Sequence, residues 1–383
     1  MNITFFSSVS TREKVFNCIP EIKKHNVKFF KLNESDRLLS DGFDTDLLFI
    51  DAMGTLDKML IDSMPNLKLI MSEGVGYQGI DVEYATKKGI PVCNNKGVND
   101  TGVSEIALFL MLGCLRNFSK GVDEIYNGRQ IEFKKASFGV KKELSECTVG
   151  LIGFGDIARK TAEFCNALGA KVIYTNRTRY KNLEEKLNVQ YASLDKLLSE
   201  SDIVSLHVAL TPDTINTVDD NFLSKMKNDA FLINTSRGDL VDNNALKNAL
   251  LKGEIAGAGL DVFTPEPLEK ENPLLDIKLK DKLILTPHIA GITHLTVERI
   301  YKNILENTQN IIHGRELKNK VNLKKFRLKI SNGIFYLYQS FFLPWIYTLI
   351  TFKSWLSLSI FLSTTAKSAD CPASSLVHSA LFL

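Results

Sequence analysis

Short apolar runs alternate with longer amphipathic stretches along residues 1–322. This alternation is typical of a parallel β-sheet covered by helices on both faces, because each parallel strand needs a crossover connection to the next. In the first third of the chain the apolar runs predict strands at residues 2–6, 27–31, 47–50, 67–71 and 90–93. These five strands, with helices between them, predict one small doubly wound domain.

A second unit follows a long apolar-periodic segment at residues 103–126. Further apolar runs predict six strands at residues 148–152, 171–175, 203–208, 230–234, 258–262 and 283–285. The pattern therefore predicts an α/β fold with two doubly wound parallel-sheet domains.

Residues 323–383 differ in composition from the rest of the chain. They carry six Lys or Arg residues and one Asp, so the net charge of +3 for the whole chain leaves −2 for residues 1–322. The sequence pI of about 8.3 is thus a property of this extension. The body of the protein gives no electrostatic reason to expect a nucleic-acid partner.

Within this extension, residues 333–352 form a run of 20 residues without a charge. Such a run is long enough to span a membrane, although Gln339, Ser340 and Pro344 interrupt it. Three interpretations remain open: a membrane anchor, an apolar segment packed on the body or a partner, and a non-native extension without a role. The third is favoured, and catalysis is expected not to require the extension.

The cysteines and the amino end indicate a reducing compartment. No two of the six cysteines form a CxxC pair, so neither a zinc site nor a disulfide framework has its usual spacing. Residues 1–6 are typical of a first strand rather than of a signal peptide. We therefore predict a cytoplasmic protein without a metal site.

A glycine turn follows the predicted strand at residues 148–152 and opens an amphipathic helix through Leu168. In a dinucleotide-binding turn, the first glycine (Gly153) permits the tight turn and the second (Gly155) lets a diphosphate approach the backbone. Ala158 is small enough for close packing of helix on strand. The helix amino end then offers N–H groups and a positive dipole end to the diphosphate.

The next strand ends where an acid would accept the adenosine ribose hydroxyls. The sequence there is Asn176-Arg177-Thr178-Arg179, without a carboxylate. Arginine pairs well with phosphate, whereas Asp would repel a 2′-phosphate. The segment therefore favours NADP(H) over NAD(H).

Three later strand ends carry an arginine, a carboxylate and a histidine, namely Arg237, Glu266 and His288. Loops after the carboxyl ends of strands face the ligand crevice in an open α/β sheet, so these side chains are expected to converge. Arg237 can bind a substrate carboxylate, His288 can exchange a hydroxyl proton, and Glu266 can orient the ring and stabilise its protonated form.

Taken in order, these segments resemble the D-isomer-specific 2-hydroxyacid dehydrogenase family over essentially all of residues 45–322. The resemblance includes Gly74-Val75-Gly76, followed by Ile80-Asp81, and the segments 95–99, 103–105 and 205–211. It implies a substrate domain at 1–98 completed by 290–322, a dinucleotide-binding domain at 99–289, and an extension at 323–383. The activity it implies is NADPH-dependent reduction of a small 2-oxo acid to the D-2-hydroxy acid, in the manner of glyoxylate or hydroxypyruvate reductase, and the reverse oxidation.

The resemblance also assigns roles to residues. Arg237 matches the substrate-binding arginine, Glu266 the orienting acid and His288 the acid/base histidine, while Val75 and Gly76 match a turn whose N–H groups hold the substrate carboxylate. The predicted cofactor-binding residues are Gly153, Phe154, Gly155, Asp156, Ile157, Asn176, Arg177, Thr178, His207, Val208, Ala209, Thr235, Ser236, Asp261 and His288.

Lys96 and Ala209 stand where this family more often has proline. Two alternatives stay open: a 3-phosphoglycerate dehydrogenase, which would need cations for a substrate phosphate, and a dinucleotide-sensing corepressor-like scaffold. The segment from Val103 through residues 116–142 matches the family's dimer-forming region, so the resemblance implies a homodimer.

Overall fold

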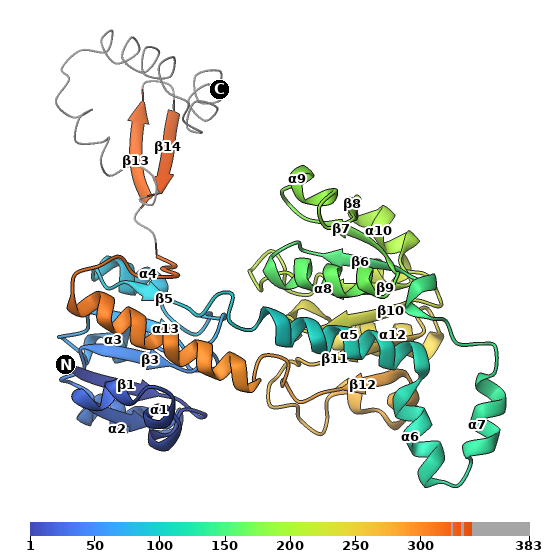
Figure 1. Ribbon diagram of the computed structural model, residues 1–383, viewed down its shortest axis with the longest axis horizontal. Coiled ribbons are helices and arrows are strands. Elements are labelled where there is room, and N and C mark those ends of the chain that lie inside the picture. Colours follow the sequence, from blue (N-terminus) through green and yellow to red (C-terminus); the bar gives the residue numbers. More distant parts are fainter. Residues whose placement is uncertain (323–324, 331–332, 339–383) are drawn as a thin grey trace.

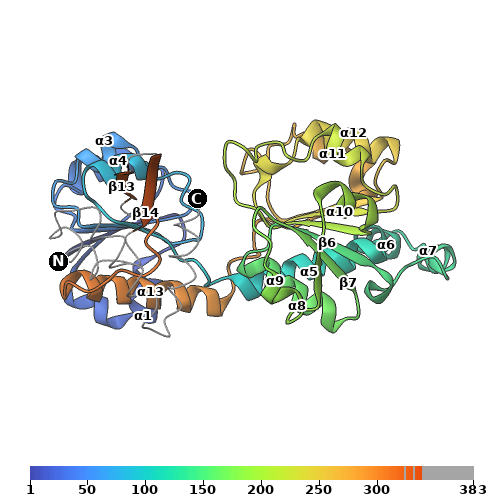
Figure 2. The same ribbon diagram turned by 90° about the horizontal axis from the view of Figure 1, so that it is seen from above.

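The structure is a computed structural model that describes residues 1–322, 325–330 and 333–338. The body consists of two α/β domains that lie side by side and are joined by two chain segments (Figures 1 and 2). The predicted fold class is confirmed.

The first domain contains a five-stranded parallel sheet in the order β2-β1-β3-β4-β5. This is the flavodoxin-like order, in which the chain reverses direction beside its first strand. The strands are β1 (Asn2–Phe6), β2 (Asn26–Phe30), β3 (Leu47–Ile50), β4 (Leu69–Ser72) and β5 (Val92–Cys93). The helices between them are α1 (Arg12–Cys18), α2 (Ser35–Asp41), α3 (Lys58–Asp62) and α4 (Val82–Lys87).

Both faces of this sheet are buried, as continuous apolar strands require. The core on one face includes Leu38, Leu60 and Ala85 from α2, α3 and α4. On the other face, Val15 of α1 packs with Tyr301 and Ile304 of the C-terminal helix α13 (His294–Ile312). Helix α13 starts after the last strand of the second domain and runs along the first sheet (Figure 1).

The second domain contains a seven-stranded parallel sheet in the order β12-β11-β10-β9-β6-β7-β8. The strands are β6 (Thr148–Ile152), β7 (Lys171–Thr175), β8 (Val189–Tyr191), β9 (Ile203–Leu206), β10 (Phe231–Asn234), β11 (Gly257–Leu260) and β12 (Leu283–Leu285). The order reverses between β6 and β9, which creates the crevice where such sheets bind ligands.

The helices of the second domain cover both faces of its sheet. Helices α5 (Asp100–Arg116) and α8 (Asp156–Ala167) cover one face, and α10 (Leu194–Glu200), α11 (Asp220–Ser224) and α12 (Asn243–Lys252) cover the other. Helix α9 (Lys181–Glu184) precedes β8. Helices α6 (Phe118–Tyr126) and α7 (Gln130–Ser137) form an arm beside the domain (Figure 1).

One sequence prediction about this domain needs correction. The prediction of six strands is wrong because β8 adds a seventh, and only Val189 of its three residues is buried, so the strand lacks an apolar signal. The apolar-periodic segment 103–126 forms two helices, α5 and α6. Asn117 has a left-handed backbone (φ 50°), which ends α5 and starts α6 in a new direction.

The C-terminal segment returns to the first domain. The N–H of Val321 donates to the carbonyl of Val92 at 2.8 Å, and the side-chain Oδ1 of Asn322 accepts from the N–H of Val92 at 2.8 Å. Beyond it, β13 (Lys325–Ile330) and β14 (Gly333–Tyr338) pair as an antiparallel hairpin.

Among the described residues, no single helix has both the length and the apolar character for a membrane span; α5 and α6 pass such a test only as a pair bent by 60°. The first six residues of the uncharged run 333–352 form β14, and residues 339–352 lie outside the described residues.

Candidate active site

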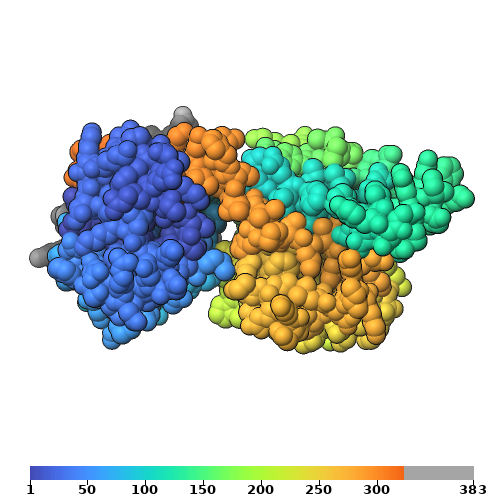
Figure 3. All heavy atoms as spheres, turned by 90° about the horizontal axis from the view of Figure 1, so that it is seen from below, coloured from blue at the N-terminus to red at the C-terminus, as the bar shows by residue number. Residues whose placement is uncertain are grey.

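The predicted catalytic side chains come together at the carboxyl ends of the second sheet. A cleft separates the two domains (Figure 3). Arg237 follows β10, Glu266 follows β11 and His288 follows β12. These three strands are neighbours in the sheet, so their following loops meet at one edge.

His288 and Glu266 form a direct side-chain pair. The Nδ1 atom of His288 lies 2.9 Å from the Oε1 atom of Glu266. The exposed fractions of the two side chains are 36% and 21%, so the pair is partly shielded and still reachable from the cleft. With Nδ1 engaged by the carboxylate, Nε2 is the ring atom left to exchange a proton with a ligand.

Asp261 anchors the loop that carries His288. Its Oδ1 atom accepts from the Thr286 hydroxyl at 2.6 Å and the Ile289 N–H at 3.0 Å, and its Oδ2 atom accepts from the Ala290 N–H at 3.0 Å. His288 has φ 52°, a left-handed conformation that costs a non-glycine residue roughly 1–2 kcal/mol. The three bonds to the buried Asp261 carboxylate offset this cost and hold the ring toward Glu266.

Arg237 lies largely within the protein, and burial and neighbouring charges have opposite effects on its guanidinium. Burial lowers the pKa of its guanidinium, while the neighbouring carboxylates of Glu266 and Asp239 act in the opposite direction. Its Nη1 atom donates to the carbonyl of Ser236 at 2.6 Å. Gly238 lets the Arg237 loop approach the next loop, because a Cβ there would lie 1.9 Å from the backbone carbonyl of Phe263.

The turn Gly74-Val75-Gly76 of the first domain reaches Arg237. A Cβ at Gly76 would lie 2.1 Å from the Nη2 atom of Arg237, so any larger residue would require the guanidinium to move from this position. The carbonyls of the turn point back into their own domain, where Asn94 Nδ2 donates to Val75 at 2.8 Å and the Ser72 hydroxyl donates to Gly76 at 2.6 Å. The predicted substrate-binding residues of the two domains are therefore adjacent.

The glycine turn after β6 fits a dinucleotide diphosphate. Gly153 has φ 91°, and a Cβ there would lie 2.5 Å from the carbonyl oxygen of His207, so two independent reasons require glycine. A Cβ at Gly155 would meet open space, which is the room that a diphosphate needs next to the first turn of α8. Ala158 is fully buried under this turn.

A buried hydroxyl at the carboxyl end of β10 also fits a ligand in this crevice. Thr235 is 8% exposed, and its Oγ1 atom has no hydrogen-bond partner among the residues that the structure describes. Buried polar atoms are normally satisfied, so such an orphan is a natural contact for a bound polar group. The neighbouring Ser236 hydroxyl is already engaged by the carbonyl of Leu206 at 2.8 Å.

The predicted 2′-phosphate segment follows β7 at the same edge. Asn176, half-buried, donates from Nδ2 to the carbonyl of Thr178 at 2.9 Å, while Arg177 and Thr178 are exposed. Arg179 instead binds Glu184 through two bonds of 2.7 Å, and this carboxylate also lies 3.1 Å from the Tyr174 hydroxyl. Arg179 is thus occupied by an acid of its own domain.

The remaining predicted cofactor residues differ in burial and in the hydrogen bonds they already make. Desolvation lowers the pKa of His207 to about 4, so its ring is neutral, and its Nε2 atom lies 2.9 Å from the Ser205 hydroxyl. Val208 is half-buried and Ala209 is exposed.

The ring of Phe154 turns into the core and stacks on Tyr174 with centroids 4.0 Å apart, so only its backbone is available to a ligand. The carbonyl of Ile157 accepts from the Ser104 hydroxyl at 3.0 Å.

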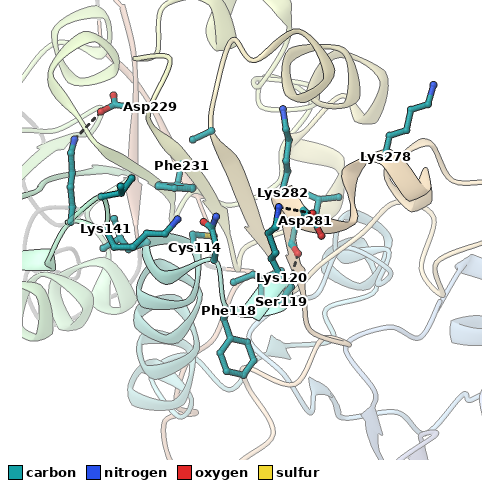
Figure 4. A pocket seen from close by; sticks show the side chains of 17 residues that line it. Cys114, Phe118, Ser119, Lys120, Lys141, Asp229, Phe231, Lys278, Asp281 and Lys282 are labelled. Atoms are coloured by element: carbon teal, nitrogen blue, oxygen red, sulfur yellow. Dashed lines mark hydrogen bonds and ion pairs between the residues drawn. The ribbon is translucent and has the colours of Figure 1, made fainter. Parts of the chain in front are cut away.

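A separate cavity of about 560 Å³ lies at the amino ends of β10, β11 and β12 (Figure 4). Its lining includes Cys114 and Asn117 at the end of α5, Lys141 from the returning arm, and Phe231 and Leu283 from the strands. This is the opposite edge of the sheet from the His288–Glu266 pair.

Comparisons with known proteins agree with this architecture. The family described as "D-isomer specific 2-hydroxyacid dehydrogenase, NAD binding domain" matches residues 108–290. The glyoxylate reductase of Thermococcus litoralis is 39% identical over 284 residues, which are 71% of this chain and 84% of that protein. The hydroxypyruvate reductase of Thermotoga maritima is 36% identical over 275 residues, 71% of this chain and 87% of that protein.

A solved structure shows the same fold. The D-lactate dehydrogenase of Aquifex aeolicus, complexed with NAD and lactic acid, aligns with a TM-score of 0.71 and 30% identity over 81% of this chain and 96% of that chain. Two doubly wound domains with a glycine turn and an Arg, Glu and His at one cleft define a dinucleotide-dependent oxidoreductase. The chain belongs to the D-isomer-specific 2-hydroxyacid dehydrogenase family, whose members act on a CH–OH group.

Sequence reasoning missed two interactions near the site. The Arg179–Glu184 pair could have been predicted from the sequence, because an acid follows the arginine by five residues in the first turn of a helix. Glu73, directly after the buried strand β4, is fully enclosed and accepts from the hydroxyls of Ser7 and Ser10, each at 2.5 Å. Its partners lie in the loop after β1, and spacing along the chain does not reveal them.

Proposed function

We propose that this protein catalyses NADPH-dependent reduction of a small 2-oxo acid of the glyoxylate or hydroxypyruvate type to the D-2-hydroxy acid, and the reverse oxidation. The observation that carries the proposal is the His288–Glu266 pair at 2.9 Å beside Arg237 in the cleft. The curated relatives named as glyoxylate and hydroxypyruvate reductases support the substrate class.

Arg237 and the turn at Val75 and Gly76 bind the substrate carboxylate. The guanidinium offers two parallel donors, and partial burial strengthens the charge-assisted bonds. The carbonyls of Gly74 and Val75 are held within the first domain by the Asn95 N–H at 2.9 Å and by Asn94 Nδ2 at 2.8 Å. The N–H groups of Val75 and Gly76 lie on the opposite side of these trans peptides, so they serve the cleft. The carboxylate so held places the adjacent carbonyl carbon in one orientation, which sets the hand of the product.

His288 supplies the proton at the carbonyl oxygen. The Nε2–H of the protonated ring donates to that oxygen as its negative charge develops, and the proton passes to it during reduction. Glu266 holds Nδ1–H, fixes the ring orientation and stabilises the charged ring until the proton leaves. The bound nicotinamide supplies or accepts the hydride.

The cofactor is proposed to be NADP(H) in preference to NAD(H). Gly153 to Ile157 receive the diphosphate, Thr235, Ser236 and Asp261 lie on the nicotinamide side, and His207 to Ala209 line the adenosine side. The exposed segment of Asn176, Arg177 and Thr178 receives the 2′-phosphate, because it offers a cation and a hydroxyl where an NAD-type site has an acid.

The molecule is proposed to be a cytoplasmic homodimer built on α5, α6 and α7. The arm exposes Tyr126 (87%) and Phe138 (85%), two large apolar side chains that a second copy would cover. The five cysteines of residues 1–322 are free thiols, as expected in a reducing compartment. We further propose the domain boundaries 1–98 with 290–322, 99–289, and 323–383.

The proposal is tested by steady-state turnover of glyoxylate, hydroxypyruvate, 3-phosphohydroxypyruvate, pyruvate and 2-oxoglutarate, each with NADPH and NADH. We expect the highest kcat/KM for glyoxylate or hydroxypyruvate with NADPH. A preference for 3-phosphohydroxypyruvate would point to a phosphoglycerate dehydrogenase, and cofactor binding without turnover of any acid would point to a sensing scaffold.

A further inference from the structure

One ion pair connects the two domains at the diphosphate turn. The Nζ atom of Lys96, which follows β5 in the first domain, lies 3.5 Å from the Oδ2 atom of Asp156. Asp156 is the first residue of α8 in the second domain. The contact therefore spans the cleft at the position where the cofactor diphosphate is proposed to bind.

The backbone of Lys96 is fixed to the first domain. Its N–H donates to the Oδ1 atom of Asn94 at 3.3 Å, and its carbonyl accepts from the Nδ2 atom of Asn319 at 3.2 Å. The Asn94 N–H in turn donates to the Asn319 carbonyl at 3.1 Å. The side chain is 66% exposed, so the ammonium group is mobile on a four-carbon stem whose base is held.

Two cations, Lys96 and Arg159, lie around Asp156 at the start of α8. The Nη1 atom of Arg159 also lies 3.5 Å from Asp156, and the Arg159 guanidinium lies over the Tyr180 ring at 4.8 Å. The Nε atom of Arg159 is buried and finds no hydrogen-bond partner within the described part of the chain. Two cations and a helix amino end thus lie beside the open space at Gly155. The carboxylate of Asp100 is close enough to act on both Lys96 and Asp156, so it forms part of the same charge cluster.

We propose that Lys96 is a cofactor-binding residue that the first domain contributes to the diphosphate site. In the free protein its ammonium is shared with Asp156; with the dinucleotide bound, the diphosphate, which carries more negative charge than one carboxylate, attracts it instead. This inference rests on the proposed dinucleotide site and goes beyond it.

The contact also connects the proposed diphosphate site to the substrate turn of the first domain. Asn94 holds both the backbone of Lys96 and the carbonyl of Val75, so an attraction between Lys96 and the diphosphate acts on the same part of the first domain as the substrate turn. We therefore expect the dinucleotide and the 2-oxo acid each to raise the affinity of the protein for the other.

The direct test compares two probes by calorimetric titration of the full chain. ADP-ribose contains the diphosphate, whereas adenosine 2′-monophosphate contains the adenosine end without either phosphate of the diphosphate. Lys96→Gln should weaken ADP-ribose by about threefold to tenfold, given the partial exposure of the side chain, and leave adenosine 2′-monophosphate unchanged. Lys96→Arg should restore most of the affinity. Lys160→Gln is the control. Lys160 lies on α8, as Asp156 does, but pairs with Glu163 at 2.7 Å, so its loss should leave the affinity for ADP-ribose unchanged.

A double-mutant cycle with Asp156→Asn separates contact with the diphosphate from neutralisation of Asp156. If Lys96 contacts the diphosphate, Lys96→Gln still weakens ADP-ribose in the Asp156→Asn background. Loss of the effect in that background, or equal affinity of wild type and Lys96→Gln, would overturn the inference. Failure of the wild type to bind ADP-ribose or NADPH at all would instead overturn the proposed function on which it rests.

Discussion

The guanidinium of Arg237 occupies the space where Gly76 lacks a side chain, and the two residues belong to different domains. A Cβ at Gly76 would lie 2.1 Å from Nη2 and 3.3 Å from Cζ of Arg237. The proposed carboxylate site is thus complete only where the first domain meets the second. This explains why an enzyme of this type needs a cleft between two sheets rather than a pocket within one.

Gly76→Ala is expected to displace Arg237 from the substrate site. The methyl group requires the guanidinium to leave its present position, so the KM for the 2-oxo acid should rise about tenfold, while the dissociation constant for NADPH stays unchanged. Steady-state kinetics and a cofactor titration measure the two effects.

Gly128→Ala is the control, because Gly128 has open space around its Cβ position and a φ of 71°. It should lower stability by about 1 kcal/mol without raising KM. An unchanged KM in Gly76→Ala would show that the turn does not place the substrate next to Arg237.

Arg177→Ala is expected to weaken NADPH roughly tenfold and to leave NADH nearly unchanged, because only NADPH carries a 2′-phosphate. Arg179→Ala is the matched comparison: Arg179 is held by Glu184 at 2.7 Å, so its loss should destabilise the fold locally and change the ratio of the two affinities little. Fluorescence titrations with both cofactors give this ratio. Equal weakening of NADPH and NADH by Arg177→Ala would contradict the assignment.

The stability of the protein should depend on pH through Glu73. Burial, opposed by the Ser10 and Ser7 hydroxyls and reinforced by the charge of Asp51, raises the pKa of this carboxyl from 4.5 to about 7. The native state therefore binds more protons than the unfolded state between these values. Stability falls as the pH rises through this window, and the loss is complete above about pH 7.

Glu73→Gln removes this titration. Urea unfolding at about pH 5 and about pH 8 should show that the wild type loses on the order of 3 kcal/mol more than Glu73→Gln between the two conditions. A difference between the two proteins that does not vary with pH would show that Glu73 does not titrate in this range.

A protein that ends at Asn322 should keep the activity and thermal stability of the full chain. The Nδ2 atom of Asn322 donates to the Ile90 carbonyl at 2.7 Å, so the contacts of this segment with the first domain are retained. A protein that ends at Gly314 loses them and should unfold at a lower temperature. Thermal unfolding and steady-state turnover of the two truncated proteins test this. Loss of activity in the protein that ends at Asn322 would show that residues 323–383 are needed for the active structure.

Much of this architecture could be predicted from the sequence, because parallel sheets leave strong local signals. Continuous apolar strands are buried on both faces, and the polar residues that follow them, such as Arg237 and His288, stand out against that background. The glycine turn was equally visible, since Gly153 needs a left-handed backbone that few other residues adopt.

The features that could not be predicted depend on contacts between distant residues. The pairing of Lys96 with Asp156 and the enclosure of Glu73 by Ser7 and Ser10 follow from the way the loops meet after folding. The break at Asn117 leaves no signal in the apolar periodicity, which continues on both sides of it.

The most direct test of the proposed reaction is the rate of NADPH oxidation with saturating glyoxylate or hydroxypyruvate, in the wild type, His288→Ala and Glu266→Gln. We expect wild-type turnover, a fall of 10²–10⁴-fold in His288→Ala with NADPH affinity retained, and a smaller fall with an altered pH profile in Glu266→Gln. The account would be contradicted if His288→Ala kept more than about a tenth of the wild-type rate.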